Sequence, residues 1–237
     1  MVGSHRFLVA TVGALAVAGL ALSGCAADSG PGAGSPVPSD PDLGAAWLDN
    51  GRMVGLVTLG SSTCIPSLDD EAEYTGGTLH VTFADPKADE ACTADLVPRV
   101  TLVDLPEGID PEQDLEIEVT GEEYYGEVVL EGVAGLDPSG ETDYQPSAGW
   151  AIADGQFVIL TWGSSTCIPL MEDIAATGPA EVTVTYATPP ADEVCTLDMV
   201  ARGAVAWVND LEQTVDIELV LTGGEFADVR VPIYGNN

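Results

Sequence analysis

Basic residues are scarce in this 237-residue chain. Six Lys and Arg residues stand against 39 Asp and Glu residues, which gives a formal net charge of −33. A surface this acidic repels nucleic acid and anionic lipid, so the composition argues against both as partners. Divalent-cation binding is the alternative interpretation of the charge, because clustered carboxylates suit hard cations such as calcium.

Side-chain combinations that most catalytic sites need are missing as well. His80 is the only histidine after residue 25, and it lies on the polar face of a predicted strand. Without a second base, the serines of the repeated loop have no partner that could activate them. These serines are Ser61, Ser62, Ser164 and Ser165. We therefore expect no enzyme, no catalytic residue, no bound cofactor and an exposed His80.

The first 24 residues have the plan of a signal peptide. Arg6 precedes an uncharged stretch from Phe7 to Gly24, and Cys25 follows. The segment Leu22–Cys25 resembles the lipobox of bacterial lipoproteins, which implies that the Cys25 thiol is diacylglycerylated and that the chain is cut before it. An uncleaved transmembrane helix is the alternative, since about 18 apolar residues approach the length that spans a bilayer. We favour a protein anchored to the outer face of the cell membrane, because the cysteine closes the run.

Residues 25–45 are predicted to form a disordered tether, because Gly, Ser, Pro and Asp dominate them and bulky apolar residues are nearly absent. All 39 acidic residues and five of the six basic residues follow Cys25, so the mature chain carries five positive against 39 negative charges. This composition resembles that of exported lipoproteins from high-GC Gram-positive bacteria.

The mature chain contains an internal repeat. The segment Gly60–Pro66 (GSSTCIP) recurs unchanged as Gly163–Pro169, at an offset of 103 residues, and residues 88–99 match residues 191–202 at the same offset. Two gap-free matches at one offset indicate a duplication. We expect copy one at residues 46–134, a polar linker at 135–148 and copy two at 149–237.

Apolar residues inside each copy recur with a period of two, which is typical of strands with one buried face. In copy two, Val182, Val184 and Tyr186 alternate with threonines. Turn dipeptides such as Asn50-Gly51 separate the apolar runs, and no stretch after residue 45 has a helical period. We predict an all-β protein with two tandem β-sandwich domains, immunoglobulin-like in the broad architectural sense.

Four cysteines remain if Cys25 carries lipid, and four cysteines allow three pairings. Both copies space their two cysteines by 28 residues, which predicts one disulfide in each copy. The predicted pairs are Cys64 with Cys92 and Cys167 with Cys195. Crossed pairing between copies is the alternative. Export favours disulfides over a metal or redox site, and the CxxC spacing of such sites is absent.

Two of the five mature basic residues, Arg99 and Arg202, occupy equivalent positions in the two copies. We expect each to form a structural ion pair with a carboxylate of a neighbouring strand, such as the repeated Asp89-Glu90 or Asp192-Glu193. An anion-binding site is the alternative.

Calcium binding depends on two acidic clusters. Asp137, Ser139, Glu141 and Asp143 place oxygen atoms at every second position, and Asp69–Glu71 with Glu73 form the other cluster. An EF-hand loop counted from Asp137 would need a glycine at its sixth position and a glutamate at its twelfth, and both are missing. We therefore expect an ordinary acidic linker and no metal site.

Two functions stay open. The first is a non-catalytic cell-envelope module that binds an envelope or extracellular partner through strand edges or loop ends. The second is a calcium- or solute-binding lipoprotein that uses its acidic clusters. We favour the first, with the GSSTC segment as a tight loop whose glycine and hydroxyl groups satisfy backbone groups of the turn before the disulfide.

Overall fold

The computed structural model describes residues 43–87, 89–121, 124–151, 153–209, 211 and 216–236. The predicted signal peptide, Cys25 and most of the predicted tether lie outside these ranges. The described chain is all-β, and its only helical element is the short 3-10 turn η1 (Asp49–Gly51). None of the helices in the described part is long and apolar enough to cross a membrane.

Within the described residues, each copy contributes seven strands in the same order along the chain. In copy one they are β1 (Leu43–Leu48), β2 (Met53–Gly60), β3 (Glu73–Thr75), β4 (Thr78–Thr82), β5 (Val97–Asp104), β6 (Leu115–Thr120) and β7 (Tyr125–Leu130). In copy two they are β8 (Ser147–Trp150), β9 (Gln156–Gly163), β10 (Met171–Gly178), β11 (Glu181–Tyr186), β12 (Val200–Trp207), β13 (Glu218–Gly223) and β14 (Phe226–Tyr234). β1 and β8 therefore begin slightly before the predicted domain starts at residues 46 and 149.

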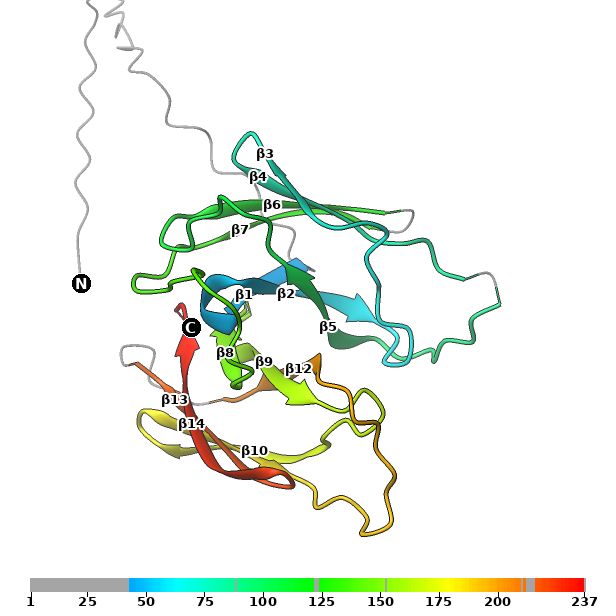
Figure 1. Cartoon of the computed structure of the whole chain (residues 1–237), viewed down its shortest axis with the longest axis vertical. Helices are drawn as coiled ribbons and strands as arrows, with labels where there is room; N and C mark the ends of the chain where they lie inside the picture. Colours follow the sequence, from blue (N-terminus) through cyan, green and yellow to red (C-terminus); the bar gives the residue numbers. More distant parts are fainter. Residues whose placement is uncertain are drawn as a thin grey trace, which may run out of the picture. The chain divides into compact units, whose positions relative to one another are not determined.

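The strands of copy one form two sheets, β1-β2-β5 and β3-β4-β6-β7 (Figure 1). Copy two repeats both strand orders, and a short parallel pairing of β14 with β8 joins its sheets into one of seven strands. β4 and β6 pair in parallel, as do β11 and β13, because the intervening β5 or β12 belongs to the other sheet. Immunoglobulin sheets are antiparallel, so this strand pairing differs from the immunoglobulin arrangement.

In each copy, a three-stranded group (β1-β2-β5 or β8-β9-β12) and a four-stranded group (β3-β4-β6-β7 or β10-β11-β13-β14) enclose a hydrophobic core. In copy one it includes Trp47 of β1, Leu56 of β2 and Ile117 of β6, all nearly inaccessible to solvent. In copy two, Val182, Val184 and Tyr186 of β11 are buried while the threonines between them are partly exposed. The predicted alternation of buried and solvent-facing positions is therefore confirmed in these outer strands.

A third core lies between the copies, where the strands β1-β2-β5 of copy one face the strands β8-β9-β12 of copy two. On β9, Phe157 and Ile159 point into the core of copy two, while Val158 and Leu160 point into the third core. All four side chains are fully buried, so β9 is covered on both faces. The shared core joins the described residues from 43 onward into one compact unit, in which the two copies pack directly against each other.

Candidate functional site

Two loops meet at one end of each copy and are joined there by a disulfide. Cys64 bonds to Cys92 and Cys167 bonds to Cys195, with Cα–Cα distances of 5.6 and 5.5 Å. The predicted pairing is confirmed and the crossed alternative is wrong. We call residues 61–72 and 83–96 the copy-one loop end, and residues 164–170 and 187–199 the copy-two loop end. Figure 1 shows both at the same end of the compact unit.

Hydroxyl groups of the repeated GSSTC segment fasten the two loops to each other. In copy two, the Thr196 amide donates to Thr166 Oγ1 over 3.1 Å, and the Thr166 amide donates to Ser164 Oγ over 3.2 Å. Ser164 Oγ also lies 2.8 Å from Thr196 Oγ1. Copy one repeats these contacts with Ser61, Thr63 and Thr93. The expectation that these hydroxyls satisfy backbone groups of the turn is confirmed.

An aspartate in each loop end completes the network. Asp198 Oδ1 accepts the Ser165 amide over 3.1 Å and the Thr196 hydroxyl, and Asp95 does the same with Ser62 and Thr93. Hydrogen bonds from Ser165 and then Thr196 lower the pKa of Asp198 from 3.8 to about 2. Hydrogen bonds from Thr93 and then Ser62 lower the pKa of Asp95 to the same value. Both loop ends therefore keep a carboxylate that is ionised even in moderately acidic solution.

This arrangement predicts how the loop ends respond to acid. Because the folded pKa of Asp198 lies below its unfolded value, the ionised carboxylate stabilises the folded loop above about pH 4, and this contribution is lost as the pH falls toward 2. In Thr196→Val the pKa of Asp198 should rise toward 3.8. Carboxyl carbon NMR titration measures this shift. Thr188→Val, at an exposed threonine of the same loop, is the control, and titration of wild-type Asp198 near 3.8 would contradict the network.

The repeated arginines lie buried directly beneath the loop ends. Arg202 donates to the carbonyls of Cys167 (3.0 Å) and Trp162 (2.9 Å) and pairs with Glu225. Glu225 lies in the turn between β13 and β14, so the ion pair links the facing sheets. The expected partners Asp192 and Glu193 are wrong, since the carboxylate that pairs with Arg202 is Glu225, while the Glu193 carboxylate lies beside the disulfide sulfurs.

Arg99 holds the copy-one loop end in a similar way. Its guanidinium donates to the carbonyls of Ser61 and Cys64 and to the hydroxyl of Tyr124, and it lies 5.9 Å from the centre of the Tyr124 ring. Both arginines are more than nine-tenths buried. Loop carbonyls accept hydrogen bonds from both guanidinium groups, although Arg202 Nε itself has no hydrogen-bond partner among the described residues. This is the geometry of a structural support for the loops.

Each arginine packs flat on the first glycine of the repeated segment. A Cβ atom added to Gly163 would lie 2.7 Å from Arg202 Cζ, and Gly60 contacts Arg99 in the same way. Gly163→Ala should therefore displace Arg202 and lower the free energy of unfolding by about 1–3 kcal/mol, measured by urea denaturation. Gly178→Ala is the matched control, because its Cβ would make only ordinary contact at 3.5 Å with Glu181. Equal stability of the two variants would contradict this packing.

Large apolar side chains point into solvent from both loop ends. In copy two they are Ile168, Leu170, Val194, Leu197 and Met199, with exposed fractions from 59% for Met199 to 105% for Leu197. In copy one they are Ile65 (53%) and Leu96 (72%), the equivalents of Ile168 and Met199. Sequence reasoning missed this surface. The sequence does contain a sign of it, because the two copies differ at three equivalent positions. Copy two has Leu170, Val194 and Leu197 where copy one has Ser67, Ala91 and Ala94.

The segment between the copies is bound to the first turn of copy one. Asp49 Oδ1 accepts the Thr142 hydroxyl over 3.0 Å, and the Asp49 amide donates to Ser147 Oγ over 2.8 Å. Asn50 exchanges hydrogen bonds with the backbone of Asp137. An open hollow of about 640 Å³ lies beside this contact and is lined by Arg52, Asp104 and Trp162 among others.

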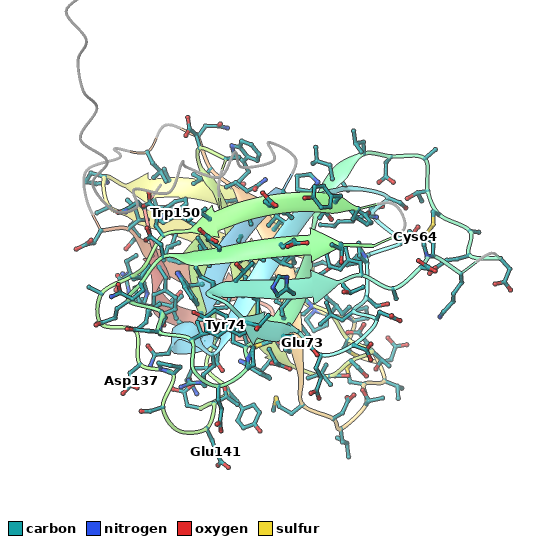
Figure 2. All side chains as sticks on the ribbon, turned by 90° about the horizontal axis from the view of Figure 1, so that it is seen from above. Cys64, Glu73, Tyr74, Asp137, Glu141 and Trp150 are labelled. Carbon is teal, nitrogen blue, oxygen red and sulfur yellow. A yellow bond between two sulfur atoms is a disulfide. The ribbon has the colours of Figure 1, made fainter. Side chains whose placement is uncertain are left out.

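The two predicted acidic clusters do not gather their carboxylates. Asp137 and Asp143 each accept a backbone amide two residues further on, and Asp137 and Glu141 point outward in Figure 2. Within the described ranges, three ligand atoms come together only at Cys167, Glu193 and Cys195, where both sulfurs are already bonded to each other.

His80 lies on β4, with Nδ1 3.5 Å from Glu118 Oε2 on the adjacent β6. Its side chain is 40% exposed, which agrees with the expected position on the polar face of the strand.

Comparison with protein-family models, with curated proteins and with solved structures finds no match to this chain. The functional argument therefore depends on the loop ends themselves. They are cross-linked by a disulfide and by hydrogen bonds, repeated and exposed, and they combine apolar and acidic side chains.

Proposed function

We propose that this protein is an exported lipoprotein, anchored to the outer face of the cell membrane through Cys25, whose two fused β-sandwich copies form a non-catalytic binding module. The signal-peptide plan and the lipobox-like segment support the anchor. The two disulfides are compatible with an oxidising compartment.

The observation that carries the binding function is the exposure of the apolar loop-end side chains. A lone exposed leucine is ordinary, but a group of apolar side chains on one rigid surface is typical of interaction sites. In copy two, five such side chains lie within four residues of a disulfide cysteine along the chain, and Leu197 is as exposed as in an extended chain. The binding partner should therefore contact the loop ends, and the strands should serve as their scaffold.

The anchor is tested in cells that produce the full-length chain. Metabolic labelling with an alkyne fatty acid should mark the wild-type protein, and Cys25→Ser should remove the label. Ser23→Ala keeps the cysteine and serves as the control. Persistence of the label in Cys25→Ser would disprove the lipidation.

The binding function is tested with the chain from residue 26 onward, which contains all the residues that the structure describes. The fluorescent protein should bind saturably to cells of the producing organism that lack their own copy. Val194→Ser with Leu197→Ser should weaken binding by about tenfold or more. Tyr125→Ser removes a side chain of β7 that is 72% exposed and should leave binding unchanged. Unsaturable binding, or equal binding by all variants, would disprove a role of the loop ends.

A further inference from the structure

We infer that the copy-two loop end docks onto a protein whose contact face has an apolar centre surrounded by basic residues. This inference rests on the proposed binding function and adds the chemistry of the partner and the copy that makes the main contact.

The apolar part of the argument is the arrangement of side chains around the copy-two disulfide. Ile168 follows Cys167, while Val194 and Leu197 lie on either side of Cys195, and the exposed fractions of these three side chains are 63%, 89% and 105%. The disulfide, the Ser164–Thr196 contact and the Asp198 hydrogen bonds fix both loops. These bonds hold together the two chain segments that carry the exposed side chains. Burying them against a partner would contribute roughly 25 cal/mol per Å² of apolar surface.

The disulfide and the hydrogen bonds of the copy-two loop end also favour binding in another way. A loop that is already ordered loses little conformational entropy when it docks, so more of the contact energy appears as affinity. Both chain segments of the copy-two loop end are tied at two places, by the disulfide and by the hydroxyl network. This is the preorganisation expected of a recognition surface.

The charge part of the argument concerns the side chains interspersed with the apolar ones. Residues 164–170 and 187–199 contain Asp192, Glu193 and Asp198 and no Lys or Arg. All three carboxylates are exposed, and Glu172 and Asp173 continue the acidic surface onto β10. The nearest cation in the sequence, Arg202, is buried and already paired with Glu225. Cationic partners offset the lost hydration of carboxylates at an interface, so a basic face is complementary to this acidic surface.

A membrane is the other surface that could accept exposed apolar side chains. Anionic headgroups would repel Asp198, which lies between Leu197 and Met199, as well as Asp192 and Glu193, which precede Val194. The acidic surface therefore favours a protein over a lipid bilayer.

Copy one provides a control that is built into the chain. Its loop end has the same frame, but Ser67, Ala91 and Ala94 replace three of the large apolar residues of copy two. It also carries seven acidic residues and one lysine. With less apolar area and more charge, copy one should contribute mainly to electrostatic steering, and copy two should supply the main contact.

The test uses two amphipathic helical probe peptides, one of leucine and lysine and one of leucine and glutamate, added to the chain from residue 26 onward. Backbone amide NMR spectra identify the residues that contact each peptide. The leucine–lysine peptide should shift the resonances of residues 164–170 and 187–199 most strongly. Val194→Ser with Leu197→Ser should weaken its binding by about tenfold, while Ala91→Ser with Ala94→Ser should change it by less than about twofold.

Each other outcome has a defined meaning. Equal binding of both peptides at the copy-two loop end would disprove the basic rim and leave the proposed binding function intact. Shifts confined to other surfaces would disprove the inference and count against the proposed function. Stronger binding to phosphatidylglycerol vesicles than to the leucine–lysine peptide, abolished by the same double serine variant, would identify a membrane as the occupant and overturn the protein partner.

Discussion

Replacing Cys167 and Cys195 together by serine should lower the free energy of unfolding by about 3–4 kcal/mol. The bridge joins two cysteines that are 28 residues apart in the sequence. Its removal restores the conformational entropy of the intervening loop to the unfolded chain. The folded state should lose little else, because both sulfur atoms lie near the surface and bury no core. Urea denaturation of wild type and of the Cys167→Ser/Cys195→Ser double variant measures the difference.

The same change in copy one is the matched control. Cys64 and Cys92 have the same separation and the same surrounding hydroxyl network, so their replacement should cost a similar amount. A loss below about 1 kcal/mol in either copy would show that the bridges do not constrain the unfolded chain as the entropy argument requires.

Leu160→Ala should destabilise both copies at once. Leu160 is fully buried in the third core, where it packs with residues of both copies. Truncation of such a leucine costs about 2–5 kcal/mol, because the surrounding side chains close the cavity only in part. Thermal and urea unfolding should show one cooperative transition that shifts as a whole, and no separate transition for each copy.

Leu197→Ala is the control for this prediction. It removes the same atoms from a side chain that is wholly exposed, so stability should change by no more than about 0.5 kcal/mol. Two transitions in wild type, or a Leu160→Ala effect confined to one copy, would show that the copies fold as separate domains.

Much of the fold follows from local patterns. The alternation in Val182, Val184 and Tyr186 predicted an outer strand with one buried face, and the equal spacing of the cysteines predicted the disulfides. These predictions succeeded because periodicity and duplication are properties of short segments that tertiary contacts seldom override.

The third core was not predicted, and β9 shows why. Phe157, Val158, Ile159 and Leu160 are consecutive apolar residues, a pattern typical of a strand buried on both faces. Period-two reasoning looks for one apolar face per strand, so it assigned the copies separate cores. What covers the second face depends on the packing of segments about 100 residues apart, which no local pattern specifies.

The contacts that hold the loop ends in place were predicted only in part. Arg202 was expected to form an ion pair, but its partner Glu225 lies in the turn between β13 and β14 and could not be found from spacing along one strand. The exposed apolar side chains were missed because a leucine in a polar loop is ambiguous from sequence. Only the structure shows that Leu197 turns outward.

The central claim is that the copy-two loop end contacts a partner on the cell surface. A photo-crosslinking amino acid placed at residue 197 of the full-length chain tests it on intact cells. Residue 94 is the equivalent position in copy one, and residue 125 is an exposed position on β7. We predict one dominant protein adduct at residue 197, a weaker one at residue 94 and none at residue 125. An adduct at residue 125 with none at residue 197 would contradict the account.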